Sequence, residues 1–182
     1  MTDVRDPDYA TADGPVDLDA LSTLDRMREV ASYNLFDASM REELDLICQR
    51  TAQRLDQPIG LVTIVLNNAQ LVVGKSGLAG WIAESEGTPA EWAFCARAVI
   101  AGKPYVVPDA SADPVQRENP LVANDHVTAY AGVPLRSPGG QVLGAHCVLN
   151  DQPHDFTPAE VGELERAAIE ILDVLNHYRR VS

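Results

Sequence analysis

Two cysteines, Cys95 and Cys147, have the side chains best suited to nucleophilic or redox chemistry in this 182-residue sequence. A thiol becomes a good nucleophile only when a cation or a helix N-terminus favours its thiolate form. Cys95 falls just after the first turn of an expected short helix, which gives mild activation, whereas Arg97 faces another side of that helix. The alternative for both cysteines is a place in the core, where a buried thiol packs as a small apolar group.

The cysteine pattern limits the redox chemistry that the chain supports. Cys48, Cys95 and Cys147 are odd in number and widely separated, and the sequence has no Cys-x-x-Cys pair. This pattern excludes a zinc ribbon and a thioredoxin-type motif, and a disulfide framework is not expected in a cytoplasmic chain. We therefore predict three reduced, unpaired thiols.

The four histidines could in principle ligate haem iron or another metal, but they do not have the spacing of a metal site. His146 and Cys147 are adjacent in an expected strand, so their side chains point to opposite faces and cannot share one ion. His126 falls in a long polar stretch and His154 in a turn. His177 lies near the C-terminal end of the last expected helix, where a cation suits the helix dipole. Neither a metal site nor a cofactor is predicted.

Aspartates and tryptophans mark the expected loops. Asp109 and Asp113 bracket a Ser-Ala pair, which is typical of a turn in which aspartate caps backbone amides. The alternative for Asp109 is ligand or water binding at the mouth of a pocket. Trp81 and Trp92 flank a loop and could either stack on a ligand or pack beneath that loop. The sequence has no Ser-His-Asp order, phosphate-binding loop or His-Glu-x-x-His motif.

The net charge argues against anionic partners. The chain has 14 Lys and Arg against 27 Asp and Glu, which gives a net charge of −13, and it lacks a basic cluster. Such a chain repels phosphates and anionic lipid heads, so neither nucleic acid nor a membrane is an expected partner. The apolar runs are far shorter than the ~20 residues that span a bilayer. Because the first residues do not resemble a signal peptide, we expect the protein in the cytoplasm.

The helices that must position these residues follow an acidic stretch. Residues 1–20 hold six aspartates and few apolar groups, so we expect a flexible acidic N-terminal tail before a single domain over 21–182. Apolar residues at helical spacing and capping boxes at Ser39–Glu42 and Thr157–Glu160 mark the helices of that domain. They are expected over 21–33, from Ser39 to the stop at Pro58, over 91–101, and from Thr157 past Leu175.

Apolar runs between turn signals predict the strands. They occupy 59–66, 70–75, 105–107, 128–136 and 141–149, with tight turns at Asn67–Asn68 and Ser137–Gly140. Residues 76–90 are expected to form a loop, and 111–127 a long loop that carries function or a short helix. This order predicts an α+β fold with an antiparallel sheet of five or six strands and helices on one face.

Several short motifs follow one another in the order found in a known family. They are Phe94-Cys95, Val107-Pro108-Asp109, Asn119-Pro120-Leu121-Val122, Tyr130-Ala131-Gly132-Val133-Pro134-Leu135, the segment from Gly139 to Leu149, and Phe156-Thr157-Pro158. Together they resemble a GAF domain over roughly 24–179. The resemblance implies a six-stranded antiparallel sheet flanked by helices, with a small-molecule pocket on one sheet face under the long loops.

The resemblance favours a non-enzymatic, stand-alone sensory or regulatory module that binds a small molecule, a signalling protein partner or both. One alternative is a GAF-type enzyme that reduces free methionine sulfoxide with Cys95 or Cys147, although the close cysteine arrangement of that class is missing from the sequence. Another alternative is a scaffold or dimerisation module without a ligand. The signatures of GAF domains that bind cyclic nucleotides or bilins are also missing.

The pocket is expected beneath residues 76–100 and 110–127, where two long loops cover the sheet and the short helix. Its candidate lining residues fall on that helix, on the strands beneath the loops and at the pocket mouth: Trp92, Phe94, Cys95, Val107, Asp109, Tyr130, Gly132, Leu135, Ala145 and Cys147. The strand register decides which of them face the pocket, because a slip of one residue reverses every side chain.

A homodimer through helices is also expected. The first helix carries a narrow apolar stripe of Leu21, Leu24, Met27 and Val30, and the last helix has a face broad enough for both the sheet and a neighbour. Apolar surface that one domain cannot hide typically marks an interface, and two-fold pairing of identical surfaces is the commonest arrangement. GAF domains often pair through helical bundles, so the resemblance points the same way.

Overall fold

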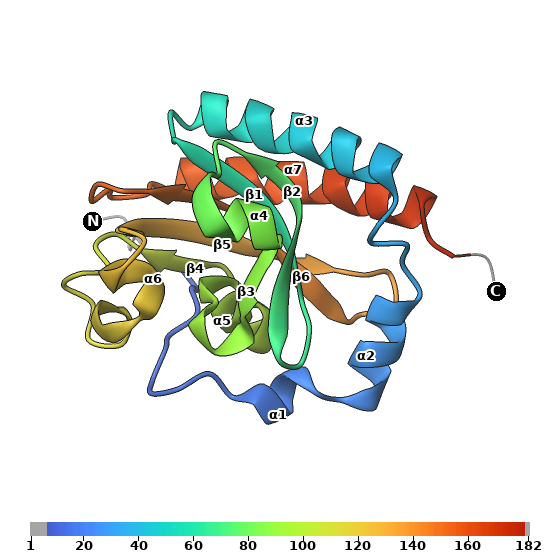
Figure 1. The fold of residues 1–182 in the computed structure, drawn as a ribbon, viewed down its shortest axis with the longest axis horizontal. Helices are drawn as coiled ribbons and strands as arrows, with labels where there is room; N and C mark the ends of the chain where they lie inside the picture. The colour runs from blue at the N-terminus through green and yellow to red at the C-terminus, as the bar shows by residue number, and fades with distance from the viewer. Residues whose placement is uncertain (1–6, 181–182) are drawn as a thin grey trace, which may run out of the picture.

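A six-stranded antiparallel sheet lies between two layers of helices in the computed structural model, which describes residues 7–180 (Figure 1). The strands are β1 (Ile59–Val65), β2 (Ala69–Ser76), β3 (Gly87–Pro89), β4 (Tyr105–Val107), β5 (Ala129–Arg136) and β6 (Val142–Asn150). Their order across the sheet is β3-β2-β1-β6-β5-β4. The central position of β1 and β6 explains why both are apolar on both faces. The predicted α+β fold, with the larger of the two strand numbers, is confirmed.

Helices cover both faces of the sheet. They are α1 (Leu18–Leu21), α2 (Leu24–Ala31), α3 (Ala38–Arg54), α4 (Gly80–Ser85), α5 (Phe94–Ala101), α6 (Pro120–Ala123) and α7 (Pro158–His177), with single 3₁₀ turns at Ala90–Trp92 and Gln116–Glu118. In Figure 1, α3 and α7 run side by side over one face, and α5 packs on the other. The expectation of helices on one face alone is wrong, and the flanked sheet that the family resemblance implies is confirmed.

Each face of the sheet has its own apolar core because side chains alternate along every strand. Ile64 and Val133 belong to the core beneath α3 and α7, whereas Leu61 and Ala145 belong to the core beneath α5. Gly74 lets α3 approach β2 closely, since a Cβ at this position would lie 2.7 Å from Leu44 Cβ. The second core continues into the cavity described below.

Several element boundaries differ from the expected ones. The helix expected over 21–33 is broken into α1 and α2, and α3 begins at Ala38 because Asp37, not Ser39, caps it by accepting from the Met40 amide at 3.0 Å. The loop expected over 76–90 contains α4 and β3. The capping box at Thr157 and Glu160 starts α7 as predicted.

Residues 7–20, expected as part of a tail, follow the surface of the domain in the structure. The Ala10 amide donates to the Pro104 carbonyl at 2.7 Å, the Arg97 guanidinium donates to the Gly14 carbonyl at 2.6 Å, and Val16 is buried. The two hydrogen bonds to the backbone and the burial of Val16 order a segment whose composition alone favours disorder. Residues 1–6 of the expected tail lie outside the described residues.

Arg26 organises the junction between α1 and α2. Its side chain is 4 % exposed and donates to the carbonyl of Leu21 at 3.0 Å, of Val142 at 2.9 Å, of Leu143 at 3.1 Å and of Val65. Burial lowers the pKa of Arg26 to about 10. One guanidinium therefore pairs carbonyls from α1, β1 and β6, a role that suits its fixed fork of donors.

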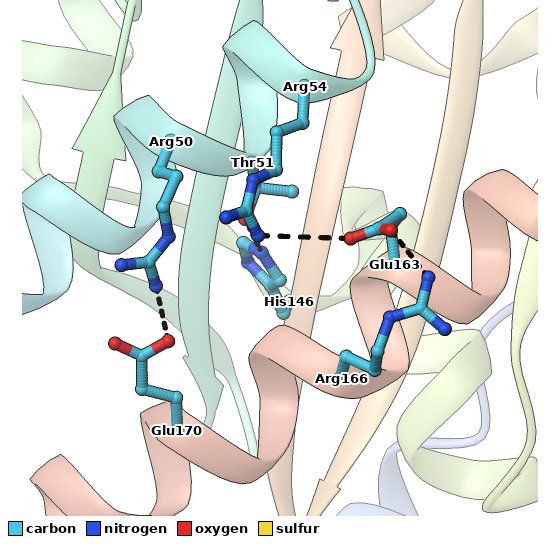
Figure 2. A network of polar contacts seen from close by, with 7 residues as sticks. All are labelled: Arg50, Thr51, Arg54, His146, Glu163, Arg166 and Glu170. Atoms are coloured by element: carbon cyan, nitrogen blue, oxygen red, sulfur yellow. Dashed lines mark hydrogen bonds and ion pairs between the residues drawn. The ribbon is translucent and has the colours of Figure 1, made fainter.

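A band of ion pairs joins α3 to α7 at the surface (Figure 2). Arg50 pairs with Glu170, and Glu163 forms ion pairs with Arg166 at 2.5 Å and with Arg54 at 3.9 Å. Exposed pairs of this kind contribute roughly 0–1 kcal/mol each. The band therefore aligns the two helices, and the apolar core beneath them supplies most of the stabilisation.

Candidate functional site

A cavity of ≈ 370 Å³ lies on the sheet face opposite α3 and α7. Its floor comes from β1, β2, β5 and β6, its side from α5, and its cover from segments around α4 and α6. The lining is mostly apolar and consists of Pro58, Ile59, Leu61, Gln70, Val72, Gly77, Leu78, Ala79, Ile82, Thr88, Phe94, Cys95, Leu121, Asp125, His126, Val127, Tyr130, Cys147, Leu149 and Asp151. Volume and lining are typical of a small-molecule site.

Four of the ten predicted lining residues face this cavity: Phe94, Cys95, Tyr130 and Cys147. Leu135 does not, because it is on the opposite face of β5, in the core beneath α3 and α7. Val107 and Ala145 are on the correct face but belong to the packed part of the core beneath α5. The structure therefore corrects these three predictions.

The other three predicted residues have structural roles. The Asp109 carboxylate accepts from the Ser111 amide at 3.1 Å and the Ser111 hydroxyl at 2.6 Å, which is the turn alternative. Trp92 packs edge-on against Trp81, with ring centroids 6.4 Å apart, outside the cavity. Gly132 is covered by Tyr130, since a Cβ at residue 132 would lie 2.0 Å from the Tyr130 hydroxyl oxygen.

The glycine at 132 leaves room for the Tyr130 hydroxyl beside the Cys95 thiol. The Tyr130 hydroxyl donates to Cys95 Sγ at 3.1 Å, and Cys95 Sγ lies 3.8 Å from Cys147 Sγ. Phe94 completes the wall, with its ring centroid 5.1 Å from that of Tyr130. Burial raises the pKa of Tyr130 well above its usual value, so its hydroxyl stays protonated and acts as a donor.

Polar groups enter the cavity at two places. Gln70 is 6 % exposed, and its side-chain amide donates to Thr88 Oγ1 at 3.3 Å, while its Oε1 atom has no hydrogen-bond partner among the described residues. Asp125, His126 and Asp151 supply the remaining polar lining. His126 adopts φ 58°, a left-handed conformation that is uncommon outside glycine and recurs at ligand sites.

Some functional candidates were missed because the sequence carries little signal for them. Gln70 precedes the apolar run Leu71–Val73 of β2, and a polar residue at the start of that run was the one available hint. Leu78 and Ile82 are in a segment that reads as a loop. Asp125 and His126 are polar residues in a polar stretch, and only the fold turns them toward the cavity.

The histidines do not provide a metal centre. His146 is fully buried beneath α3 and α7, where Nδ1 lies 2.8 Å from the Leu61 carbonyl and Nε2 lies 3.0 Å from Thr51 Oγ1 (Figure 2). Cys147 points to the opposite face, as predicted. Over the described span, His, Cys, Asp and Glu side chains do not form a group of three that could hold an ion.

The profile of the GAF domain family matches residues 39–172. This match covers most of the chain, the six-stranded sheet and the whole cavity floor, and the chain therefore belongs to the GAF domain family. Within residues 7–180, no helix combines the length and apolar character that crossing a membrane requires.

A curated relative is a cyclic di-GMP phosphodiesterase from Pseudomonas aeruginosa, which is 30% identical over 145 residues. The match covers 79% of this chain and 24% of that protein. The chain therefore spans about a quarter of the length of this relative, whose named activity belongs to the whole protein.

Solved structures share the fold at low sequence identity. The GAF domain of a phosphoenolpyruvate-protein phosphotransferase from Coxiella burnetii has a TM-score of 0.64 and 16% identity, covering 87% of this chain and 95% of that one. The Acinetobacter counterpart has a TM-score of 0.62 and 20% identity, covering 85% and 92%. A type II free methionine-R-sulfoxide reductase from Thermoplasma acidophilum has a TM-score of 0.62 and 13% identity, covering 77% and 94%. These likenesses concern the fold alone.

Proposed function

We propose that this chain is a sensory or regulatory module of the cytoplasm that binds a small molecule in the ≈ 370 Å³ cavity and passes the binding event to a signalling protein partner. The coarse role follows from membership of the GAF domain family, whose members are sensory and regulatory modules. The finer role, ligand binding, is supported by the chemistry of the cavity wall.

The observation that carries the proposal is the unpaired oxygen of Gln70. This side chain is buried in the cavity wall, and its Oε1 atom accepts no hydrogen bond from the described residues. An unsatisfied buried acceptor costs roughly 1–3 kcal/mol. A ligand that donates an N–H or O–H to Gln70 would recover this free energy on binding.

The charges around the cavity narrow the class of ligand. Asp125 and Asp151 line it, and the lining contains neither Lys nor Arg. A phosphate or carboxylate group would meet two carboxylates without a compensating cation, and Coulomb repulsion disfavours that arrangement. The expected ligand is therefore an uncharged or cationic molecule with an apolar body and one hydrogen-bond donor.

A thermal-shift screen of small metabolites against the purified protein tests this proposal. A ligand present at a hundred times its Kd stabilises a protein by about 2.7 kcal/mol, which such a screen detects. Gln70→Leu should weaken the response to hits, and Ile82→Trp, which fills the cavity, should remove it. A screen without hits, or hits that stabilise the Ile82→Trp variant equally, would leave the scaffold alternative as the better description.

Self-association is the proposed route by which the module is built into a signalling assembly. Leu24 on α2 is 62 % exposed, and Ile169 on α7 is 66 % exposed. The apolar stripe of the first helix is thus split, since Leu21 and Val30 are buried in the domain while Leu24 faces outward. A homodimer through helices would cover such side chains.

A second candidate function is reduction of free methionine sulfoxide. The observation that favours it is the 3.8 Å distance between Cys95 Sγ and Cys147 Sγ, which brings two thiols together in the cavity wall. The sequence gives no sign of this contact, because the two residues belong to separate elements. An assay of methionine sulfoxide reduction with a dithiol reductant tests this candidate. Turnover that disappears in Cys95→Ser and Cys147→Ser would establish an enzyme.

A further inference from the structure

Two thiols meet in the cavity wall with an assisting hydroxyl beside them. Cys95 Sγ on α5 lies 3.8 Å from Cys147 Sγ on β6, and the Tyr130 hydroxyl donates to Cys95 Sγ. Both cysteines are buried from bulk solvent but line the cavity, so a small molecule inside it reaches them. A disulfide requires an S–S distance of ~2.05 Å, which rotation of side chains in van der Waals contact can approach.

We propose that Cys95 and Cys147 form a peroxide-responsive dithiol that closes to an intramolecular disulfide in the cavity wall. The oxidant is a small hydroperoxide, either hydrogen peroxide or an alkyl hydroperoxide whose apolar part occupies the cavity. The proposal concerns oxidation of the protein itself and is independent of the reversible ligand binding proposed above.

The surroundings assign different roles to the two sulfurs. Cys95 is the second residue of α5, where the partial positive charge of a helix N-terminus favours a thiolate. Burial raises the pKa of the Cys95 thiol, hydrogen bonds from Cys147 and Tyr130 lower it, and the lowering prevails. The hydrogen bond with Cys95 and burial both raise the pKa of Cys147. Cys95 is therefore the attacking sulfur, and Cys147 is the resolving thiol.

The chemistry is a two-electron oxidation of the thiol pair. The Cys95 thiolate attacks one peroxide oxygen, so that an S–O bond forms, the O–O bond breaks, and an alcohol or water leaves with the proton that the thiol gave up. Cys147 then attacks the sulfenic sulfur, so that the S–S bond forms, the S–O bond breaks, and hydroxide leaves as water with the Cys147 proton. Two thiols are oxidised and one peroxide is reduced.

Cys48 provides an internal control. It lies on α3, in the core on the other side of the sheet, and does not line the cavity. Burial raises the pKa of its thiol. Its environment predicts an inert thiol that keeps its proton when the other two react.

Thiol counting after peroxide treatment of the full chain tests the proposal. Under denaturing, non-reducing conditions the untreated protein should show three free thiols, in agreement with three unpaired cysteines in the structure. After hydrogen peroxide or cumene hydroperoxide we expect one free thiol, a mass lower by two hydrogen atoms, and one peptide pair that links Cys95 to Cys147. A preference for cumene hydroperoxide would identify the alkyl form as the substrate.

The variants separate the two sulfurs. In Cys147→Ser the reaction should stop at a Cys95 sulfenic acid, which dimedone captures, whereas Cys95→Ser should give no adduct. Cys48→Ser should form the disulfide at the wild-type rate. Circular dichroism verifies folding, and the peptide map of the wild-type protein decides the question alone if a variant does not fold.

Each of the following results would overturn the proposal: three free thiols after treatment, a disulfide to Cys48, oxidation of Cys95 to sulfinic acid without a disulfide, or equal oxidation in Cys95→Ser. A disulfide that forms with free methionine sulfoxide but not with either hydroperoxide would also overturn it and would favour the reductase instead.

Discussion

Trp81 Nε1 donates to Asp125 Oδ1 at 2.7 Å, and this hydrogen bond joins the two segments that cover the cavity. Trp81 belongs to α4, and Asp125 follows α6. The two residues are 44 positions apart in the sequence. Because Trp81 is 42 % exposed, the hydrogen bond can break without unfolding the core. The cover of the cavity is therefore held partly by one bond at the surface.

Replacing Trp81 with Phe should loosen this cover, because the ring remains while the N–H donor is lost. We expect faster hydrogen–deuterium exchange over 77–85 and 121–127, with a loss of about 0.5–1.5 kcal/mol in the free energy of opening. Asp125→Asn keeps an acceptor oxygen and serves as the matched control. Equal exchange in Trp81→Phe and wild type would show that packing alone holds the cover.

Gly132→Ala should destabilise the fold by about 1–3 kcal/mol, because overpacking a tight core forces neighbours to shift. The added Cβ would lie 2.0 Å from the Tyr130 hydroxyl oxygen. Urea unfolding measures the change, and adding Tyr130→Phe should recover part of the loss. Gly162→Ala on α7 would place its Cβ in ordinary contact, 3.7 Å from the flexible Arg166 Nη1 atom, and should be stabilising by about 0.5–1 kcal/mol, as expected in a helix interior. Similar effects for the two glycines would contradict the steric argument.

Arg26→Met should be among the most destabilising substitutions in the chain. It leaves backbone carbonyls of Leu21, Val65, Val142 and Leu143 without this donor, and each buried unsatisfied group costs about 1–3 kcal/mol. Arg26→Lys should recover little, because an ammonium does not reproduce the fork of donors. Arg28→Met, on the exposed side of the same helix, is the control for urea unfolding and should stay near wild type.

His146 should make stability fall in weakly acidic solution. Burial lowers its pKa to about 4 from 6.5, so between these values the unfolded chain binds a proton that the folded chain does not. The contribution is fully present above pH 6.5 and is lost as the pH falls toward 4, with a total of about 3 kcal/mol. Urea unfolding of His146→Gln should therefore show a flatter pH dependence than wild type. Parallel curves for the two proteins would refute the assignment.

A charge at Leu24 should dissociate the proposed homodimer without unfolding the sheet, because this side chain faces outward. Sedimentation equilibrium at micromolar concentrations should give twice the chain mass for wild type and 19.7 kDa for Leu24→Glu. Ile169→Glu tests whether α7 takes part as well. A mass of 19.7 kDa for wild type at every concentration refutes the dimer.

Five of the six strands were predictable because their signal is local, whereas β3 (Gly87–Pro89) falls in a stretch expected to be a loop. Continuous apolar runs mark β1 and β6, and strong turn residues separate β5 from β6. The helix caps were harder to predict from the sequence, since Asp37 and Ser39 are both good capping residues and only the backbone conformation selects Asp37. α4 was missed because its Gly, Ser and Glu residues are as common in loops, and none of its side chains is buried.

The cavity lies beneath the two segments that are expected from the sequence to cover a pocket, but only some of the expected lining residues face it. Leu135 was assigned to the wrong face, because alternation along β5 puts Tyr130 and Leu135 on opposite sides. Cys95 and Cys147 are 52 positions apart, so their contact could not be predicted from the sequence pattern. The burial of Arg26 was not predicted, because a charged side chain is expected at the surface unless buried groups pair with it.

The adjacency of His146 and Cys147 on β6 links the two faces of the sheet. Cys147 lines the cavity, and His146 contacts Thr51 of α3, so one peptide unit connects the interior chamber to the helices on the far side. A shift of the β6 backbone at Cys147 would also shift the His146 imidazole against α3. The two layers that flank the sheet are mechanically coupled here through a single strand, at neighbouring residues.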